Sequence, residues 1–217
     1  VEPGEFGPSV VRQLCYEVKT LLLAGHETSA SMLTWTLVEL VRNPEALARA
    51  VAEADDPAVE RVGTEGAVQP PPLEYIYASL KEVLRLYSVV PTVVRETAAD
   101  TDLGPHRIPK GTSCMLLLQT VHHRGDLWPE PRAFRPERFL SGEVPQYNFV
   151  AFIQGPRNCL GQHLSLLESK VVLGLLLRRY TFTVENHDAT EPHPFIVPVA
   201  PKSGVHVRVE PRQPRAV

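Results

Sequence analysis

One ten-residue segment combines residue types whose spacing could support chemistry. It reads Phe152, Ile153, Gln154, Gly155, Pro156, Arg157, Asn158, Cys159, Leu160 and Gly161. Cys159 stands just before an apolar segment of helical period, and the N-terminal end of a helix favours an anion such as a thiolate. Gly155 permits a turn that other residues disfavour, and Gly161 permits close approach of the backbone to a ligand. The pattern indicates a reactive or ligand-binding cysteine.

The arginine and the phenylalanine of this segment indicate which ligand the cysteine could bind. Arg157 can pair with a carboxylate on a bound group, and Phe152 supplies an apolar ring near the sulfur. A thiolate in such surroundings is a suitable axial ligand for haem iron, because it donates electron density that favours O–O cleavage. A buried structural cysteine is the plain alternative. A cysteine hydrolase that pairs Cys159 with His163 is another, although no orienting acid accompanies that histidine.

A second segment, Ala24 to Ser29, places a glycine, an acid and an alcohol in the middle of a helical pattern. Gly25 removes side-chain bulk, so a flat ligand can lie against the helix. The Thr28 hydroxyl can donate to the carbonyl oxygen of Ala24, which bends the helix and opens a groove. Glu27 beside Thr28 forms an acid–alcohol pair that can relay protons. An irregular surface helix with a stray glycine is the alternative.

The cysteine segment resembles the haem-binding loop of the cytochrome P-450 superfamily, F-x-x-G-x-R-x-C-x-G, and matches it at every fixed position. Ile153 stands where relatives usually carry a small residue, and because isoleucine resists a positive φ, we expect a differently shaped turn there. Ala24 to Ser29 is similar to the family's A-G-x-E-T segment. The resemblance implies Glu27 and Thr28 as proton-delivering residues. It implies haem b as cofactor with Cys159 as iron ligand, surrounded by Phe152, Gly155, Arg157, Gly161 and Gly25.

Two charged residues lie on one face of a largely apolar helical pattern. Glu82 and Arg85 are three residues apart, so both charges must be paired if the helix is buried. In the family an E-x-x-R pairs with an arginine of a later P-E-R-F segment, which is Pro136 to Phe139 here. The resemblance therefore implies a structural triad of Glu82, Arg85 and Arg138. It also implies that Arg95, on a strand, reaches a haem propionate; an ordinary exposed strand arginine is the alternative.

The two adjacent histidines and the other two cysteines are not expected to carry chemistry. His122 and His123 resemble a family H-R pair before Trp128, with His123 in place of the arginine. Adjacent side chains on a strand point to opposite faces, which disfavours a metal site at this pair. Cys15 and Cys114 are interpreted as packing residues. Three widely spaced cysteines indicate neither a disulfide framework nor a zinc site.

Hydrophobic period and turn residues predict the elements that position these groups. Helices are expected at Ser9–Arg42, Glu45–Ala54, Leu73–Tyr87 and Leu160–Tyr180. Strands are expected at Thr92–Arg95 and Ser113–Val121 around a turn at Ile108–Gly111, and as a hairpin within Thr181–Val209 around Pro201–Gly204. His122 to Gln154 is expected to be irregular. The class is mainly α with small β-sheets, α+β. By resemblance, residues 1–217 are a single partial domain, the C-terminal half of the cytochrome P-450 fold without its N-terminal half.

Composition and charge limit the expected partners. The formal net charge is -3 without a basic run, which argues against nucleic acid. No apolar run approaches the ~20 residues that cross a bilayer, so we expect membrane association only through a segment outside this sequence, which starts at Val1. No flavin or nicotinamide fingerprint is present.

The resemblance implies a monooxygenase that inserts one atom of O2 into a small, lipophilic substrate. Its electrons come from a partner such as an NADPH-dependent reductase or a ferredoxin. A truncated, non-catalytic haem-binding fragment is the alternative, and we expect the 217-residue chain alone to bind haem poorly.

Overall fold

The computed structural model describes residues 7–62, 71–140, 142, 144–186, 191–192 and 197–213. Helices dominate these ranges, and the strands form three separate antiparallel pairs. In chain order the elements are α1 (Pro8–Arg42), α2 (Pro44–Ala54), α3 (Pro57–Glu60), α4 (Glu74–Tyr87), β1 (Thr92–Glu96), β2 (Thr101–Leu103), β3 (His106–Ile108), β4 (Ser113–Leu117), α5 (Leu118–His122), the 3-10 helix η1 (Pro136–Phe139), α6 (Gln162–Arg179), β5 (Tyr180–Val184) and β6 (Val207–Pro211). The predicted class, mainly α with small β-sheets, is confirmed.

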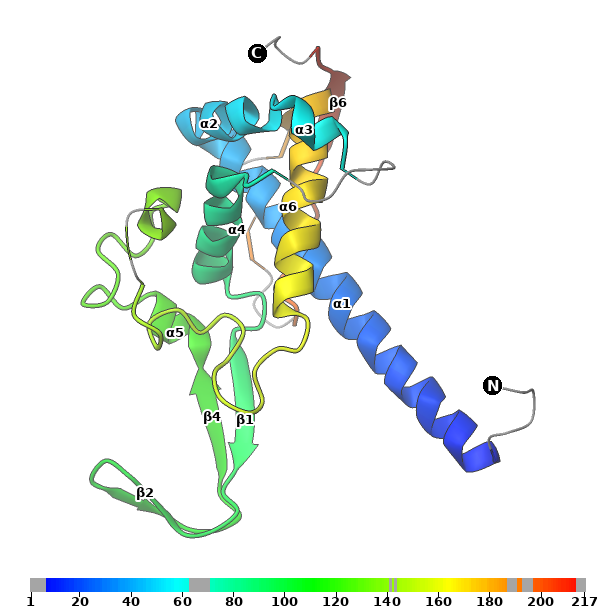
Figure 1. The fold of residues 1–217 in the computed structure, drawn as a ribbon. Coiled ribbons are helices and arrows are strands. Elements are labelled where there is room, and N and C mark those ends of the chain that lie inside the picture. Colours follow the sequence, from blue (N-terminus) through cyan, green and yellow to red (C-terminus); the bar gives the residue numbers. More distant parts are fainter. Residues whose placement is uncertain are drawn as a thin grey trace.

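The main core lies where α4 meets α6, α2 and the second half of α1 (Figure 1). Ile76, Leu80 and Leu84 recur at every fourth residue of α4, so a helix gathers them in one apolar stripe. Leu173 and Leu177 do the same on α6, and all five side chains are at most 4% exposed. Burying one such side chain contributes roughly 1.5–3 kcal/mol. This packing fixes α4 and α6, the two helices that adjoin the candidate site.

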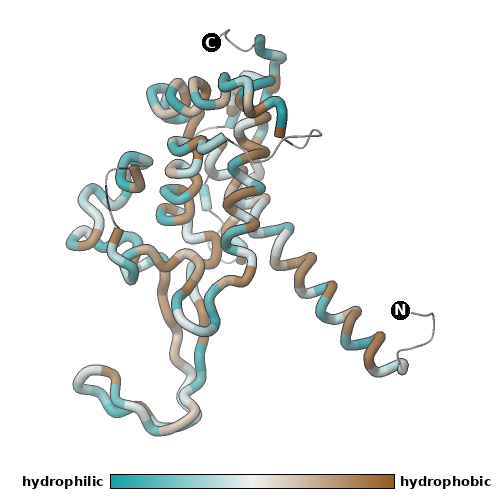
Figure 2. The backbone as a smooth tube through the Cα atoms, viewed as in Figure 1, coloured by the Kyte–Doolittle hydropathy of each residue, from teal (hydrophilic) through white to brown (hydrophobic). Residues whose placement is uncertain are grey.

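The first helix, α1, consists of an exposed half and a buried half. Met32, Trp35, Val38 and Leu40 in its C-terminal half are buried. Its N-terminal half projects away from the core, and Figure 2 shows apolar residues along it. The large apolar side chains of that half are 42–68% exposed: Val10, Val11, Leu14, Tyr16, Val18, Leu21, Leu22 and Leu23. Cys15 is exposed there too, so the prediction that Cys15 is a packing residue is wrong.

The strand pair β1–β4 differs from the prediction in the connection between the strands and in the end of β4. The two strands are antiparallel, with Arg95 opposite Cys114, and the short β2–β3 hairpin lies between them in sequence, where only a turn is predicted. The predicted second strand extends further, but β4 ends at Leu117 and α5 follows. Leu118 and His122 are four residues apart and both buried, and a single helical turn places both on the same face.

The C-terminal strands pair next to α6. Tyr180 of β5 follows Arg179 of α6 without a loop and lies opposite Pro211 of β6. The predicted pairing of two C-terminal runs is confirmed, but a tight hairpin at Pro201–Gly204 is wrong, because β5 already ends at Val184. Prolines, which have no N–H to donate, are frequent between the two strands. None of the described helices is long and apolar enough to cross a bilayer.

Candidate cofactor-binding site

The cysteine loop between Phe149 and α6 is closed by its own backbone. The N–H of Cys159 donates to the carbonyl oxygen of Phe152 over 2.9 Å. The N–H of Ile153 donates to the carbonyl oxygen of Val150 over 2.9 Å. Gly155 takes a φ of 83°, which favours glycine. The loop therefore turns sharply between Phe152 and Cys159.

Ile153 corrects a prediction within this loop. Its φ is 62°, so it adopts the left-handed conformation that isoleucine was expected to resist. That conformation costs roughly 1–2 kcal/mol for a residue other than glycine. The cost is offset by the hydrogen bonds that close the turn on either side and by the half-buried position of the Ile153 side chain. The isoleucine therefore does not prevent the turn.

The thiol of Cys159 is exposed and lies just before the N-terminal end of α6. Leu160 beside it is 90% exposed. Gly161 caps the helix, and a Cβ atom added there would meet nothing within 4 Å. Phe152, in contrast, is half-buried and packs against the main core. The loop therefore presents a thiol and open space on one side, while its phenylalanine anchors it on the other.

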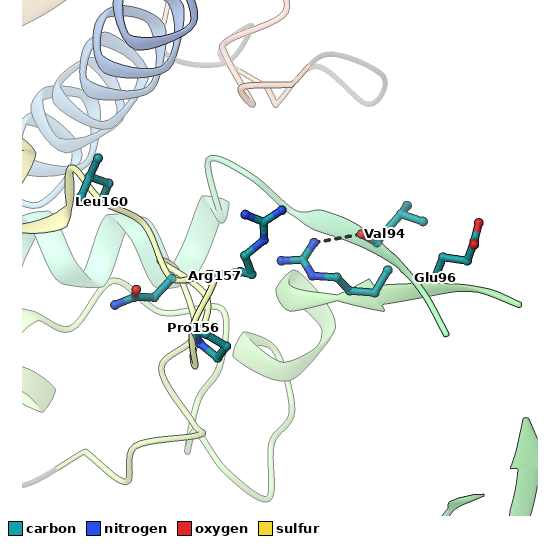
Figure 3. A pocket seen from close by; sticks show the side chains of 7 residues that line it. Val94, Glu96, Pro156, Arg157 and Leu160 are labelled. Atoms are coloured by element: carbon teal, nitrogen blue, oxygen red, sulfur yellow. Dashed lines mark hydrogen bonds between the residues drawn. The ribbon is translucent and has the colours of Figure 1, made fainter. Parts of the chain in front are cut away.

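Two arginines from distant segments line one pocket of about 580 Å³. Arg95 comes from β1, and Arg157 extends from the cysteine loop toward that strand (Figure 3). The complete lining is Val94, Arg95, Glu96, Pro156, Arg157, Asn158 and Leu160. Arg95 donates only to the carbonyl oxygen of Val94, over 2.9 Å, and neither guanidinium forms an ion pair with a described residue. The pocket therefore combines two guanidinium groups with one carboxylate, that of Glu96, and guanidinium groups bind the carboxylates of a ligand well.

The helix segment with Gly25, Glu27 and Thr28 lies on the exposed half of α1. The Thr28 hydroxyl donates to the carbonyl oxygen of Ala24 over 2.6 Å, as expected, and α1 continues without a break through this segment. Thr20 and Thr34 make the same contact elsewhere in α1, so this hydrogen bond alone does not distinguish Thr28. Within the described ranges, no hydrogen bond or ion pair joins Glu27 or Thr28 to the cysteine loop.

The structure brings Glu82, Arg85 and Arg138 together, as the resemblance implies. The Nε and Nη2 atoms of Arg85 each donate to Glu82 over 2.8 Å, and the Nε atom of Arg138 donates to the same carboxylate over 3.2 Å. Glu82 and Arg85 are fully buried. The remaining Arg85 hydrogens go to main-chain carbonyl oxygens, those of His122, Pro131 and Ala133. All of these contacts lie away from the pocket, which indicates a structural role.

The two adjacent histidines are held by the protein itself. His122 is fully buried; its Nδ1 atom lies 2.7 Å from the Ser88 hydroxyl, and its Nε2 atom accepts the N–H of Val150 over 3.0 Å. His123 contacts the carbonyl oxygen of Leu86 over 2.8 Å through Nε2. Among the described residues, no group of three or more His, Cys, Asp or Glu could hold a metal ion.

Glu53 makes a structural contact that the sequence does not predict. Its carboxylate accepts the N–H groups of Tyr75 and Ile76 over 2.7 and 3.0 Å, so α2 caps the N-terminus of α4. Leu73, the N-cap residue of α4, provides no side-chain cap. No local signal could reveal this cap, because the acid and the helix it caps are more than 20 residues apart.

The helical core thus carries an exposed thiol at a glycine-bearing loop, and this loop adjoins a pocket lined by two arginines. The cytochrome P450 family profile matches residues 11–206. The chain therefore belongs to the cytochrome P450 family. This family is a superfamily of haem-binding, haem-thiolate monooxygenases.

Individual relatives agree with this assignment. Cytochrome P450 4c21 of Blattella germanica is 38% identical over 78% of this chain, which covers 34% of that protein. A cytokinin hydroxylase of Arabidopsis thaliana is 35% identical over 90% of the chain and 38% of its own length. Putative cytochrome P450 135A1 of Mycobacterium tuberculosis is 34% identical over 95% of the chain and 43% of its own length. The chain thus spans roughly two fifths of the length of these relatives.

Proposed function

We propose that the protein containing this chain is a haem-thiolate monooxygenase that inserts one atom of O2 into a small, lipophilic substrate. The observation that carries the proposal is the cysteine loop, where the exposed Cys159 adjoins a pocket lined by Arg95 and Arg157. Haem b, when bound, supplies the iron that activates O2 under electron donation from the thiolate.

The residues around the pocket suit the edge and the face of a porphyrin. In this proposal Cys159 would ligate the haem iron, and Arg95 and Arg157 would bind the propionate carboxylates, which two guanidinium groups in one pocket can do. Gly161 leaves room beside the sulfur, because no atom lies within 4 Å of the position of its missing Cβ. Phe152 and Gly155 shape the loop rather than the pocket, since Phe152 packs against the core.

Glu27 and Thr28 are proposed to deliver protons. The Glu27 carboxylate is exposed to solvent, and the half-exposed Thr28 hydroxyl follows directly in the chain. Gly25 leaves its side of α1 open in the same turn. We expect Thr28→Val to decrease product formed per NAD(P)H consumed, and Thr34→Val, which removes the same type of backbone contact, to leave that ratio unchanged.

Electrons are proposed to come from an NADPH-dependent reductase or a ferredoxin, as membership of the family implies. The second candidate function is a non-catalytic haem-binding fragment. The exposed side chains of Leu160 and Leu164, which follow Cys159 in the chain, favour this second candidate for the chain alone. An apolar pocket wall that faces solvent binds a cofactor weakly.

The test is the absorption spectrum of the complete polypeptide encoded by the reading frame that contains this sequence. The proposal expects the red-shifted Soret band of thiolate-ligated haem in the reduced CO complex. Cys159→Ser removes that band, and Cys114→Ser, a matched control at a half-buried cysteine, retains it. A protein that stays colourless after haem supplementation, or a band that survives Cys159→Ser, contradicts the proposal. The same titration on the 217-residue chain tests whether it alone binds haem poorly.

A further inference from the structure

We propose that His122 is a positioning residue for the cysteine loop, which it holds through one hydrogen bond from its buried imidazole to the backbone of Val150. The effect of His122 on function rests on the proposed role of Cys159 as iron ligand. The placement of the loop by His122 can be measured without haem.

The hydrogen bonds of the His122 ring define its tautomer. The N–H of Val150 can only donate, so Nε2 of His122 accepts over 3.0 Å and carries no hydrogen. The proton of the neutral ring therefore lies on Nδ1 and is donated to the Ser88 hydroxyl over 2.7 Å. Ser88 in turn donates to the carbonyl oxygen of Arg85 over 3.5 Å. The ring thus connects the C-terminal end of α4 to the start of the cysteine loop.

Neighbouring groups hold the His122 ring on its other sides. It stacks on Phe149 with a centroid distance of 5.6 Å and meets Trp128 edge-on at 6.5 Å. The His122 carbonyl oxygen accepts a hydrogen bond from Arg85 over 2.9 Å. The residue therefore joins the buried Glu82–Arg85 pair to Val150 through rigid contacts.

Val150 passes this constraint to Cys159. Its carbonyl oxygen accepts the N–H of Ile153, and Phe152, one residue before Ile153, accepts the N–H of Cys159. Ile153 has a positive φ, a conformation that persists only where the surrounding structure holds it. A hydrogen bond that fixes Val150 therefore supports the strained residue that turns the chain toward Cys159.

The charges around His122 keep it a hydrogen-bond acceptor. Burial lowers the pKa of His122 to about 3, and the positive charges of Arg85 and His123 add to the effect. Glu82, the nearest carboxylate of α4, is already paired with Arg85 and Arg138. An apolar ring of similar size would fill the same space but would leave the N–H of Val150 without an acceptor.

Two substitutions of similar polarity separate positioning from packing. The amide oxygen of glutamine in His122→Gln can reach the place of Nε2 and accept from Val150. The shorter His122→Asn reaches only the place of Nδ1 and Ser88. His123→Asn is the control, because His123 lies next in the chain but contacts Leu86 and not the loop.

The first readout is amide hydrogen exchange at Val150, Ile153 and Cys159 in the complete polypeptide, with and without haem. We expect His122→Asn to increase exchange about five- to tenfold, the equivalent of one net hydrogen bond, and His122→Gln to restore most of the protection. The second is the fraction of reduced CO complex that shows thiolate ligation, which decreases in His122→Asn and recovers in His122→Gln. His123→Asn changes neither.

Ser88→Ala is a milder test that leaves the imidazole in place. It removes the acceptor of the Nδ1 proton, so the ring loses its contact with the end of α4 and holds the N–H of Val150 less firmly. Exchange at Val150 then increases. Equal behaviour of the Asn and Gln variants, or unchanged exchange at Val150 in Ser88→Ala, overturns the inference. Loss of the thiolate spectrum in the unsubstituted protein overturns the proposed function instead, and the exchange pattern still decides the role of His122.

Discussion

Glu82 and Arg85 lie one turn apart on α4 and share two hydrogen bonds of 2.8 Å, although neither side chain is exposed to solvent. Glu82 also accepts from Arg138 and from the N–H of Arg135. A buried ion pair is tolerated when its remaining hydrogen-bonding groups are satisfied, as they are here. The pair therefore joins α4 to the segment around η1, and through Arg85 to the carbonyl oxygen of His122.

Replacing Arg85 by lysine is expected to lower the free energy of unfolding by about 3 kcal/mol, because it leaves the buried Glu82 without its two-pronged partner. Lysine cannot supply the fork of donors that also reaches three main-chain carbonyl oxygens. Urea unfolding of the chain measures the change. Arg107→Lys is the control: Arg107 forms exposed ion pairs with Asp100 and Asp102, and its loss is expected to stay within about 0.5 kcal/mol. Equal losses contradict the prediction.

At most helical or loop positions alanine is at least as stabilising as glycine, but the strained turn predicts the opposite order at Ile153. With a φ of 62°, Ile153→Gly is expected to be more stable than Ile153→Ala by about 1 kcal/mol, because only alanine retains the cost of the left-handed conformation. Both variants lose the same isoleucine contacts, so the comparison isolates the backbone. On the exposed face of α2, Ala52→Gly should instead lower stability by about 1 kcal/mol. Thermal or urea unfolding of these variants decides whether the order inverts at Ile153.

The sequence predicted the long helices closely because each carries its own signal. The apolar stripe and proline boundaries place α1, α2, α4 and α6 within two residues of their observed ends. The end of β4 could not be predicted in this way, because the helical turn at Leu118–His122 is stabilised by burial of two side chains against the rest of the fold. The β5–β6 pair likewise joins segments whose contact depends on α6, so no local turn signal identifies it.

The candidate site was predictable as a set of residues but not as an arrangement. The motif pattern points to Cys159 and Arg157, and the resemblance adds Arg95. Only the structure shows that the two arginines line one pocket, because β1 and the cysteine loop meet through the tertiary fold. His122 was recognised only as half of a histidine pair. Its contact with Val150 depends on how α5 packs below the loop, which residue spacing does not encode.

The two arginines of the pocket are expected to contribute separately to haem affinity. Arg95→Gln and Arg157→Gln should each raise the haem dissociation constant of the complete polypeptide about 10-fold or more, since a hydrogen bond to a charged group contributes about 1.5–3 kcal/mol. If each binds a different propionate, the double variant shows the product of the two effects. Spectrophotometric haem titration measures them, with Arg107→Gln on β3 as a control. A control that weakens haem binding equally points to a general charge effect and contradicts the assignment.

His122 makes the stability of the fold depend on pH. Burial, reinforced by the charge of Arg85, lowers the pKa of His122 from 6.5 to about 3 in the folded chain. Between these values the unfolded chain binds a proton that the folded chain does not, so the free energy of unfolding increases with pH. The stabilisation from the neutral ring is complete above pH 6.5 and is lost as the pH falls toward 3, by about 1.4 kcal/mol per pH unit.

His122→Gln cannot titrate, so it should remove this slope while keeping the acceptor for Val150. Urea unfolding of both proteins at about pH 7 and about pH 5 should then show about 2 kcal/mol more acid destabilisation in the unsubstituted chain. The pKa of His123 is also lowered by burial, but His123 is present in both proteins and cancels from the comparison. The same acid sensitivity in both proteins would mean that the imidazole of His122 gains a proton without leaving the fold, and that Nε2 does not hold Val150.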